Sequence, residues 1–527
     1  LYRLDIDNQF PYRVYGTQQD NTSISVPSAA EWGVITMSDC TLPGTGESGF
    51  IAVHPEDSNI VYSGAVGSAP GGNGALQRYD HRTRQIQMIN VWPEESTGFA
   101  PKDLKYRFAW TFPIAFSPHD TNTIYAGGNH LFRSRNEGQS WQAISPDLSR
   151  NESEKLGLSG GALTVDSAGA EQYATLSTFV ESPHRPGELW VGTDDGLLHV
   201  SRDDGGHWRK VTPKNFPKWS YIGAVEISAH KADTIYFSAT RYKLDDYDPY
   251  LYRSQDGGKS WQSINGNFPT GEITRVIRSD AVRPGLLFVG TETGIFYSLD
   301  DGQHWSRMRG GLPVAPVYDL KIKDADLVVA THGRSFWILD DITPLREMPI
   351  SSGRKTAPLL FTPRSTYRLK LQWAAGVFDG DGKDYSPAFG LAGATYRQKQ
   401  PDGTNVRRHL DVGENPPGGA IVYYWLESQP ESAVELSICD KTGAVIESFS
   451  SAETEKPERR LPANSGLNRF VWNLSYRAVK PLDPTLVTRD YEPLAKEPKG
   501  RGPSAPPGQY DVRLSVGGRS TTASLLL

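Results

Sequence analysis

The chain has 527 residues, a length typical of two or three domains, and its 52 Gly and 37 Pro indicate short strands and turns rather than long helices. The formal net charge of −6 argues against a nucleic-acid-binding surface, which is normally basic. No apolar run is long enough for a membrane-spanning helix, and the two cysteines, Cys40 and Cys439, have no metal-ligand spacing.

Residues 1–345 predict a series of similar units of short strands. Each unit has a short strand, a polar turn, an aromatic-rich strand such as "TIYAG" or "LLFVG", a polar loop and a third strand. The first unit lies within 4–28, the second begins at 48–64, four carry a repeated box, and the last lies within 317–341. Four strands per unit, at a period of about 40–50 residues, are typical of a β-propeller blade. The sequence therefore predicts an all-β, seven-bladed propeller over 1–345.

Four of the units contain an eight-residue box with Ser first, Asp or Asn third, Gly fifth and Trp eighth. Its members are Ser134, Asn136, Gly138 and Trp141; Ser201, Asp203, Gly205 and Trp208; Ser254, Asp256, Gly258 and Trp261; and Ser298, Asp300, Gly302 and Trp305. A short Asp or Asn side chain can accept hydrogen bonds from the backbone of its own turn. Gly tolerates backbone conformations that other residues resist, and Trp can pack between sheets. We therefore expect the boxes to be structural turns between the third and fourth strands, not catalytic sites.

The rest of the chain predicts a linker and a second β domain. Residues 346–415 have mixed character and are expected to be irregular. From 416 to 527, stretches such as "AIVYYWLES", "AVELSICD" and "YDVRLSV" alternate apolar and polar residues, as half-buried antiparallel strands do. This pattern predicts a C-terminal β-sandwich of the Ig-like kind.

Candidate functional residues lie in the loops that follow the second strand of each unit, because these loops share the face opposite the boxes. Carboxylates, basic groups and aromatic rings gather there, which are the groups that bind and hydrolyse glycans. The candidate ligand-binding residues are Gln19, Asp20, Asn21, Asp194, Arg241, Tyr242, Asp245, Asp246, Tyr247, His332 and Arg334, and the candidate catalytic pair is Asp195 and Glu292. The alternative is that each carboxylate caps its own turn or pairs with an arginine.

Several strings resemble a bacterial group of BNR (Asp-box) repeat proteins related to the sortilin N-terminal domain and often labelled glycosyl hydrolases. They include "VYGTQQDN", "YRFAWTFPIAFSPHD", "ATRYKLDDYDPYLYRS", "ATHGRSFWILDD" and "GENPPGGAIVYY". The resemblance implies a secreted or periplasmic protein with an appended Ig-like domain, and another propeller upstream of this chain. Box-bearing propellers also occur in xyloglucan-cleaving enzymes, where two carboxylates face each other across a cleft between two propellers. Sialidase activity is not expected, because the Phe-Arg-Ile/Leu-Pro stretch of sialidases does not occur.

Two functions follow as hypotheses. The first is a secreted scaffold that binds a polysaccharide or a protein ligand on the loop face, without a cofactor or metal. The alternative is a glycoside hydrolase of the two-propeller xyloglucanase type, in which this chain is the C-terminal part and paired carboxylates act on a β-glucan.

Overall fold

The computed structural model describes residues 1–31, 34–47, 49–64, 74–161, 163–165, 167, 169–170, 172–350, 358–368, 383–384, 395–399, 405–409, 412–452, 459–477 and 502–527. These residues are nearly all β, in antiparallel sheets of which most in the first unit have four strands. The chain forms two compact units, one of Leu1–Ser28 with Ser38–Leu339 and one of Ala29–Met37 with Asp340–Leu527. No helix among the described residues is long and apolar enough to cross a membrane.

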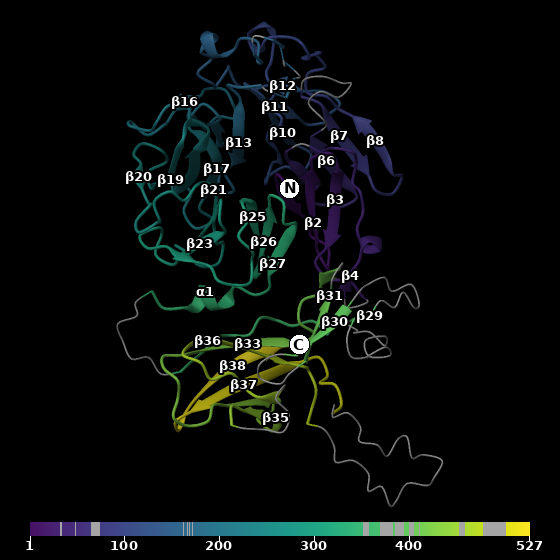
Figure 1. Ribbon diagram of the computed structural model, residues 1–527, viewed down its shortest axis with the longest axis vertical. Helices are drawn as coiled ribbons and strands as arrows, with labels where there is room; N and C mark the ends of the chain where they lie inside the picture. The colour runs from purple at the N-terminus through teal and green to yellow at the C-terminus, as the bar shows by residue number, and fades with distance from the viewer. Residues whose placement is uncertain are drawn as a thin grey trace, which may run out of the picture. The chain divides into compact units, whose positions relative to one another are not determined.

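The first unit contains seven sheets within its described residues, and in each the strands neighbour one another in chain order (Figure 1). Sheet 1 is β1 (Leu4–Ile6), β2 (Arg13–Gln18) and β3 (Thr22–Pro27). Sheet 2 is β5 (Ile51–Val53), β6 (Ile60–Gly64), β7 (Leu76–Asp80) and β8 (Gln85–Met88). Sheet 3 is β9 (Ile114–Phe116), β10 (Ile124–Gly127), β11 (Leu131–Ser134) and β12 (Gln142–Ala143). Sheet 4 is β13 (Leu176–Glu181), β14 (Leu189–Thr193), β15 (Leu198–Ser201) and β16 (Arg209–Lys210).

The remaining sheets of this unit continue the same plan. Sheet 5 is β17 (Tyr221–Ile227), β18 (Ile235–Arg241), β19 (Asp246–Ser254) and β20 (Gln262–Ser263). Sheet 6 is β21 (Thr274–Ser279), β22 (Leu287–Thr291), β23 (Ile295–Ser298) and β24 (Ser306–Arg307). Sheet 7 is β25 (Val317–Lys323), β26 (Asp326–Thr331) and β27 (Phe336–Leu339). Short 3-10 turns η2 (Pro101–Asp103), η3 (Ser153–Lys155) and η4 (Tyr242–Leu244) lie in the connections.

The first strands of successive sheets touch in order, and β25 of sheet 7 touches β1 of sheet 1, so the series closes into a ring. Leu4 and Val14 of sheet 1 share a buried cluster with Val328 and Ala330 of sheet 7, which seals this last seam. Because every sheet is a meander, the start of its first strand and the turn after its second strand lie at one face of the ring. We call this the loop face, and we call the opposite face, which carries the boxes, the box face.

The four boxes form the turns between the third and fourth strands of sheets 3 to 6. In the box of sheet 5, Gly258 and Ser260 donate backbone N–H groups to Ser254 Oγ (2.8 Å) and Asp256 Oδ1 (2.9 Å). Gly258 has a φ of +78°, and a Cβ there would meet Trp190 of the preceding sheet at 2.8 Å. The other three boxes repeat these bonds, which fixes the four turns in one geometry.

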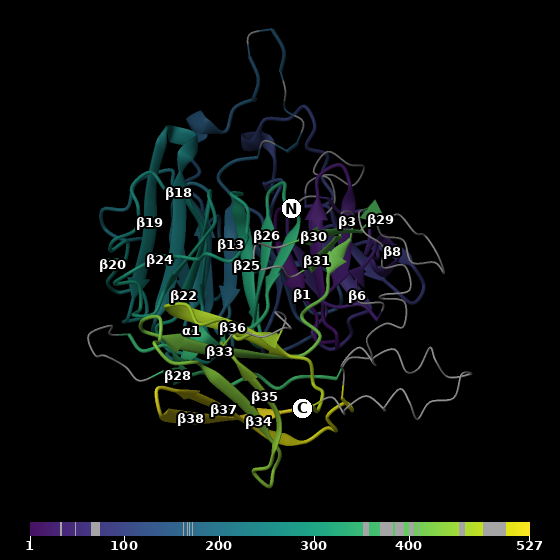
Figure 2. The ribbon, with the colours of Figure 1, turned by 60° about the horizontal axis from the view of Figure 1, so that its bottom comes forward.

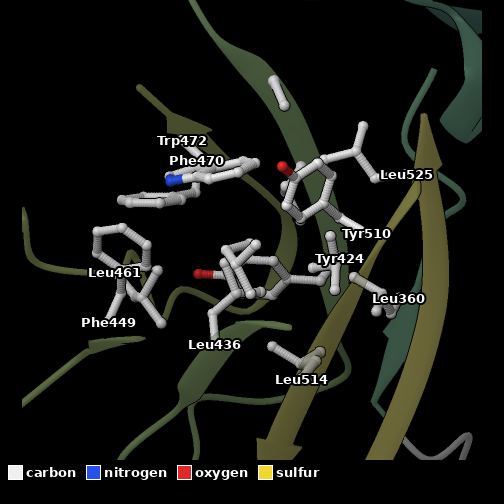
Figure 3. Packing of buried hydrophobic residues seen from close by; sticks show 14 of the residues in the cluster. Leu360, Tyr424, Leu436, Phe449, Leu461, Phe470, Trp472, Tyr510, Leu514 and Leu525 are labelled. Atoms are coloured by element: carbon white, nitrogen blue, oxygen red, sulfur yellow. The ribbon is translucent and has the colours of Figure 1, made fainter. Parts of the chain in front are cut away.

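The second unit contains two sheets that share one apolar core. One sheet has the order β28 (Leu359–Leu360), β33 (Ala420–Leu426), β36 (Gly466–Trp472), and the other has the order β35 (Val445–Ser450), β34 (Glu435–Cys439), β37 (Gln509–Val516), β38 (Arg519–Leu526). Figure 3 shows side chains of both sheets in this core, including Tyr424 and Trp472, which are fully buried. Both cysteines are free thiols.

The range 346–415, expected to be irregular, contributes strands to this second unit. Besides β28, its described residues form β29 (Lys383–Asp384), β30 (Thr395–Lys399), β31 (Asn405–His409) and β32 (Gly413–Glu414), while much of the range lies outside the described residues. β32 pairs with β4 (Val34–Ile35), which precedes η1 (Met37–Asp39). α1 (Thr343–Glu347) also belongs to this unit (Figure 2).

Candidate functional site

The loop face of the ring carries large side chains at the start of the first strands. In six of the sheets, a partly buried aromatic or arginine side chain stands at the start of the first strand or a few residues before it. These residues are Tyr2, Trp110, Tyr173, Tyr221, Arg275 and Tyr318. The register of β21 and β25 shifts by one residue at Arg275 and at Tyr318. Such a bulge re-aims a side chain locally.

Arg275 lies at the centre of a chain of contacts across this face. Its guanidinium lies 4.5 Å from the Tyr242 ring centroid and 4.7 Å from that of Tyr318. The Tyr318 ring stacks on His332 with centroids 4.6 Å apart, and His332 lies 6.0 Å from the Tyr2 ring. We call these five residues the aromatic arc. It joins sheets 5, 6, 7 and 1 with flat faces of the kind that bind amphipathic ligands.

Glu292, one of the two predicted catalytic carboxylates, is held by the aromatic arc. Arg275 donates from Nε (3.0 Å) and Nη2 (2.6 Å) to Glu292 Oε2. The Glu292 side chain is 36% exposed whereas that of Arg275 is 11% exposed. Solvent therefore reaches the carboxylate of this pair far more than the guanidinium.

Asp194 and Asp195, which follow β14, have different environments. Asp195 is fully buried, and its oxygens accept from the Thr193 hydroxyl (2.5 Å) and the Arg150 backbone N–H (2.7 Å). Asp194 is partly exposed and accepts from the backbone N–H (2.9 Å) and hydroxyl (3.0 Å) of Thr175. Burial, and then the charge of Asp195, raise the pKa of Asp194 to about 7. Burial also raises the pKa of Asp195, so the two carboxyl groups titrate as a coupled pair, of which Asp194 is the member that solvent reaches.

The 16–21 turn, with the predicted residues Gln19, Asp20 and Asn21, lies beside the aromatic arc. The Tyr2 hydroxyl donates to Gln19 Oε1, and the Asp20 backbone N–H donates to the buried Glu47. Asn21 bonds within the turn, through Nδ2 to the Gln19 carbonyl (3.1 Å). The turn therefore presents three exposed residues, Gln19, Asp20 and Asn21, of which Gln19 bonds to Tyr2.

The long loop after β18 is tied down mostly by its own side chains. Arg241 forms an ion pair with Asp246, which also accepts from the Tyr250 hydroxyl (2.7 Å). Asp245 accepts from the Tyr247 hydroxyl (3.3 Å), and both are exposed. Of the predicted residues in this loop, Tyr242 is the one that reaches the aromatic arc.

Of the two predicted residues in the 331–335 loop, His332 joins the aromatic arc and Arg334 stays on the exposed rim. Arg275, Tyr318, Tyr2, Tyr173 and Glu47 were not predicted. The signal that could have found the first four is positional, because each stands at or near the start of a first strand, on the face that the loops share. Within the described residues, no three His, Cys, Asp or Glu side chains are grouped as metal ligands.

In sequence, the chain is similar to two curated xyloglucanases. The chain is 27% identical over 244 residues to a probable oligoxyloglucan-reducing end-specific xyloglucanase of Neosartorya fischeri, and 24% identical over 174 residues to the corresponding enzyme of Emericella nidulans. These matches cover 43% and 29% of this chain but only 24% and 21% of those proteins, so the matched region is about a quarter of their length. No family model matches.

Among solved structures, the chain is similar to a GH74 xyloglucanase from Xanthomonas campestris, with a TM-score of 0.47 and 14% identity over 99% of this chain and 91% of that one. It is also similar to YCF48 from Cyanidioschyzon merolae, with a TM-score of 0.41 and 12% identity over 64% of this chain and 94% of that one.

Proposed function

We propose that the loop face of the first unit is the glycan-binding face of a glycoside hydrolase that acts on a xyloglucan-like β-glucan. The observation that carries this proposal is the aromatic arc, a continuous series of ring faces beside the partly exposed carboxyl group of Glu292. Asp194, also partly exposed, lies on the same loop face, after β14. The sequence similarity to two xyloglucanases supports the substrate class. Because the match spans about a quarter of those proteins, the activity of the whole protein is part of the proposal.

Asp194 and Glu292 are the carboxyl groups that we propose for catalysis. Hydrolysis of a glycosidic bond requires one protonated carboxylic acid and one carboxylate. Asp194, with a pKa of about 7, suits the acid, and Glu292, which accepts two hydrogen bonds from the Arg275 guanidinium, suits the carboxylate. We favour Asp194 over the neighbouring Asp195 because Asp195 is fully buried whereas Asp194 is partly exposed.

The proposal also includes the fold and the cellular location. A closed ring of seven sheets supports a seven-bladed β-propeller, and the two-sheet core of the second unit supports an Ig-like sandwich. The similarity to xyloglucanases, whose substrates are extracellular polysaccharides, supports secretion.

A non-enzymatic glycan-binding protein is the second candidate. It is favoured by one observation, that Glu292 is engaged with Arg275, as a structural or ligand-orienting carboxylate would be. In this case the aromatic arc binds the same sugar chain without cleaving it.

The test measures reducing-sugar release from xyloglucan and the affinity for a xyloglucan oligosaccharide in parallel. Wild type is compared with Asp194→Asn and Glu292→Gln, and with Asp256→Asn, a box substitution on the opposite face, as the control. Release that either loop-face variant abolishes while binding persists supports hydrolysis. Binding without release supports the second candidate. If wild type neither binds nor cleaves, the glycan-binding proposal is wrong.

A further inference from the structure

One tryptophan fills the seam between neighbouring sheets wherever a box is present. The indole N–H donates to a backbone carbonyl just after the fourth strand of the preceding sheet: Trp141 to Ile89 (3.0 Å), Trp208 to Ile144 (3.0 Å), Trp261 to Val211 (2.7 Å) and Trp305 to Ile264 (2.8 Å). Each indole also packs in a cluster with an aromatic residue from the second strand of the preceding sheet: Tyr62, Tyr125, Trp190 and Tyr236, respectively. Each of the four seams between sheets 2 and 3, 3 and 4, 4 and 5, and 5 and 6 thus has a space that a box tryptophan fills. We call this space the tryptophan slot.

The seam between sheets 1 and 2 has the aromatic residue on the second strand of the preceding sheet, Tyr15, but it lacks the tryptophan, and the described residues of sheet 1 form three strands rather than four. The turn between the third and fourth strands of sheet 2 is "DHRTRQ" (80–85), which is shorter than a box and has no Trp. Tyr15, on the second strand of sheet 1, packs with Ile51, Val53 and Val61 in a small cluster that contains no indole.

A cavity of about 150 Å³ occupies this position in the seam. Its walls come from both sheets: Gln9, Arg13, Tyr15, Thr41 and Pro43 from sheet 1 and its outer edge, and Ser58, Asn59, Val61, Tyr79 and His81 from sheet 2. The turns that supply Gln9, Ser58 and His81 all lie at the box face, where the box tryptophans of the other seams lie. A cavity of about this volume accommodates a benzene-sized ring.

We infer that the vacant tryptophan slot between sheets 1 and 2 is a binding site for a planar aromatic ring of the size of indole. The ring would lie between Tyr15 and Tyr79, as the box indoles lie between their sheets. Unlike a purely apolar void, the slot has polar side chains in its wall, among them Arg13 and Tyr15.

The polar wall is held in place by hydrogen bonds to the rest of sheet 1. Arg13 donates from Nε to Ser25 Oγ (2.7 Å) and from Nη2 to the Asp39 carbonyl (2.8 Å). The Tyr15 hydroxyl donates to the buried Asp7 (2.8 Å). These bonds fix the cationic and phenolic groups of the wall before a ligand enters, so binding does not have to order them.

The test uses indole as the probe and saturation-transfer difference NMR as the measurement on the full chain. We expect saturable binding to wild type and at least tenfold weaker binding to Ser58→Trp, in which a new indole occupies the slot. The matched control is Thr121→Trp, at the equivalent turn position of sheet 3, whose seam with sheet 2 Trp141 already fills. This control should bind indole as wild type does.

In a second blocking variant, Gln9→Trp, the new indole enters the slot from the side of sheet 1. The test therefore does not depend on the correct folding of a single variant. A peptide with a single tryptophan, capped at both ends, shows whether the ring enters as part of a protein or as a small molecule only. The inference is overturned if wild type shows no saturable binding, or if Ser58→Trp and Gln9→Trp, both folded by circular dichroism, bind indole as wild type does.

Discussion

Arg275 and Glu292 are joined by two hydrogen bonds to the same oxygen, Oε2, and the guanidinium lies between the rings of Tyr242 and Tyr318. A planar guanidinium is suited to this position because it can donate in its plane and stack on both faces. The pair therefore fixes a carboxylate and two aromatic rings relative to each other. This arrangement makes the aromatic arc a rigid surface and leads to the first prediction.

Tyr318→Ala should weaken binding of a xyloglucan oligosaccharide, because it removes the ring that lies between Arg275 and His332. An aromatic contact of about 0.5–1.5 kcal/mol corresponds to roughly 2–13-fold in Kd. Tyr318→Phe keeps the ring and should bind as wild type does, which separates stacking from hydrogen bonding by the hydroxyl. Isothermal titration calorimetry measures the effect, and Tyr297→Ala on β23 serves as a control outside the arc. Equal affinity of Tyr318→Ala and wild type would contradict a role for the arc.

Asp194→Asn should change how stability depends on pH. The pKa of Asp194 is raised to about 7 in the folded chain, so the folded state binds a proton that an unfolded Asp releases near its ordinary value. This contribution to the free energy of unfolding is fully present below about pH 4 and is lost as the pH rises to 7. For a pKa shift of about three units, the loss is at most about 4 kcal/mol. Asn carries no such charge, so the variant should not lose this stability between pH 4 and 7.

Urea unfolding at pH 4, 5.5 and 7 measures the effect. If wild type and Asp194→Asn lose the same stability over this range, Asp194 is not protonated in the folded chain. In the hydrolysis assay, the same protonation predicts that activity falls above pH 7, as the acid form of Asp194 is lost.

How much the sequence reveals depends on how far apart bonded partners lie in the chain. The box residues Ser254, Asp256 and Gly258 bond within about four positions of one another, so their spacing indicates a specific turn. Arg275 bonds to Glu292 seventeen positions away and contacts Tyr318 on the next sheet. The pairing of β21 with β22 brings Arg275 to Glu292, and the packing of β21 against β25 brings Arg275 to Tyr318, neither of which the spacing in the sequence shows.

The second unit shows the same limit over a longer distance. Ala30 donates its N–H to Asn415 Oδ1 (3.0 Å), 385 positions away, and Asn415 Nδ2 donates back to the Ala30 carbonyl (2.7 Å). This exchange, with the pairing of β4 and β32, joins residues 29–37 to the second unit. Alternating apolar residues predicted strands of the second unit, but they carry no information about a distant partner strand.

Asp256→Ala should destabilise the chain, whereas Asp256→Asn should be tolerated. The Asp256 carboxylate accepts from the backbone N–H groups of Lys259 (3.0 Å) and Ser260 (2.9 Å), and hydrogen bonds from Ser260 lower its pKa to about 2. Ala leaves these donors without the carboxylate, at a cost of about 1–2 kcal/mol. The box of sheet 3 has Asn136 at this position, with Oδ1 accepting from Ser140 N (3.0 Å), which shows that an amide serves the turn.

Thermal unfolding of the two variants, with glycan affinity measured alongside, checks this prediction. We expect a lower Tm for Asp256→Ala and unchanged affinity for both variants, because the box lies on the face opposite the aromatic arc. Equal destabilisation by Asn and Ala would mean that the charge, and not an accepting oxygen, holds the turn.

Asp319→Ala should loosen the closure of the ring between sheets 7 and 1. Asp319 is almost fully buried and accepts from Arg278 Nη2 (2.8 Å) and from the backbone N–H of Leu4 on β1 (3.3 Å). Removing this buried carboxylate takes away the closer of the two that pair with the Arg278 guanidinium, since Glu226 lies at 3.9 Å, and breaking a buried pair costs up to about 3–5 kcal/mol. Hydrogen–deuterium exchange should therefore become faster in β1 and β25 and stay unchanged in β13, on the other side of the ring.

The matched control for this closure is Asp233→Ala, which breaks the exposed pair with Arg185 and should cost less than about 1 kcal/mol. Asp319→Asn keeps an accepting oxygen for the Leu4 N–H. Its exchange rate in β1 should therefore lie between those of wild type and Asp319→Ala. If exchange in β1 is the same in Asp319→Ala and wild type, the apolar seam of Leu4, Val14 and Val328 closes the ring without this carboxylate.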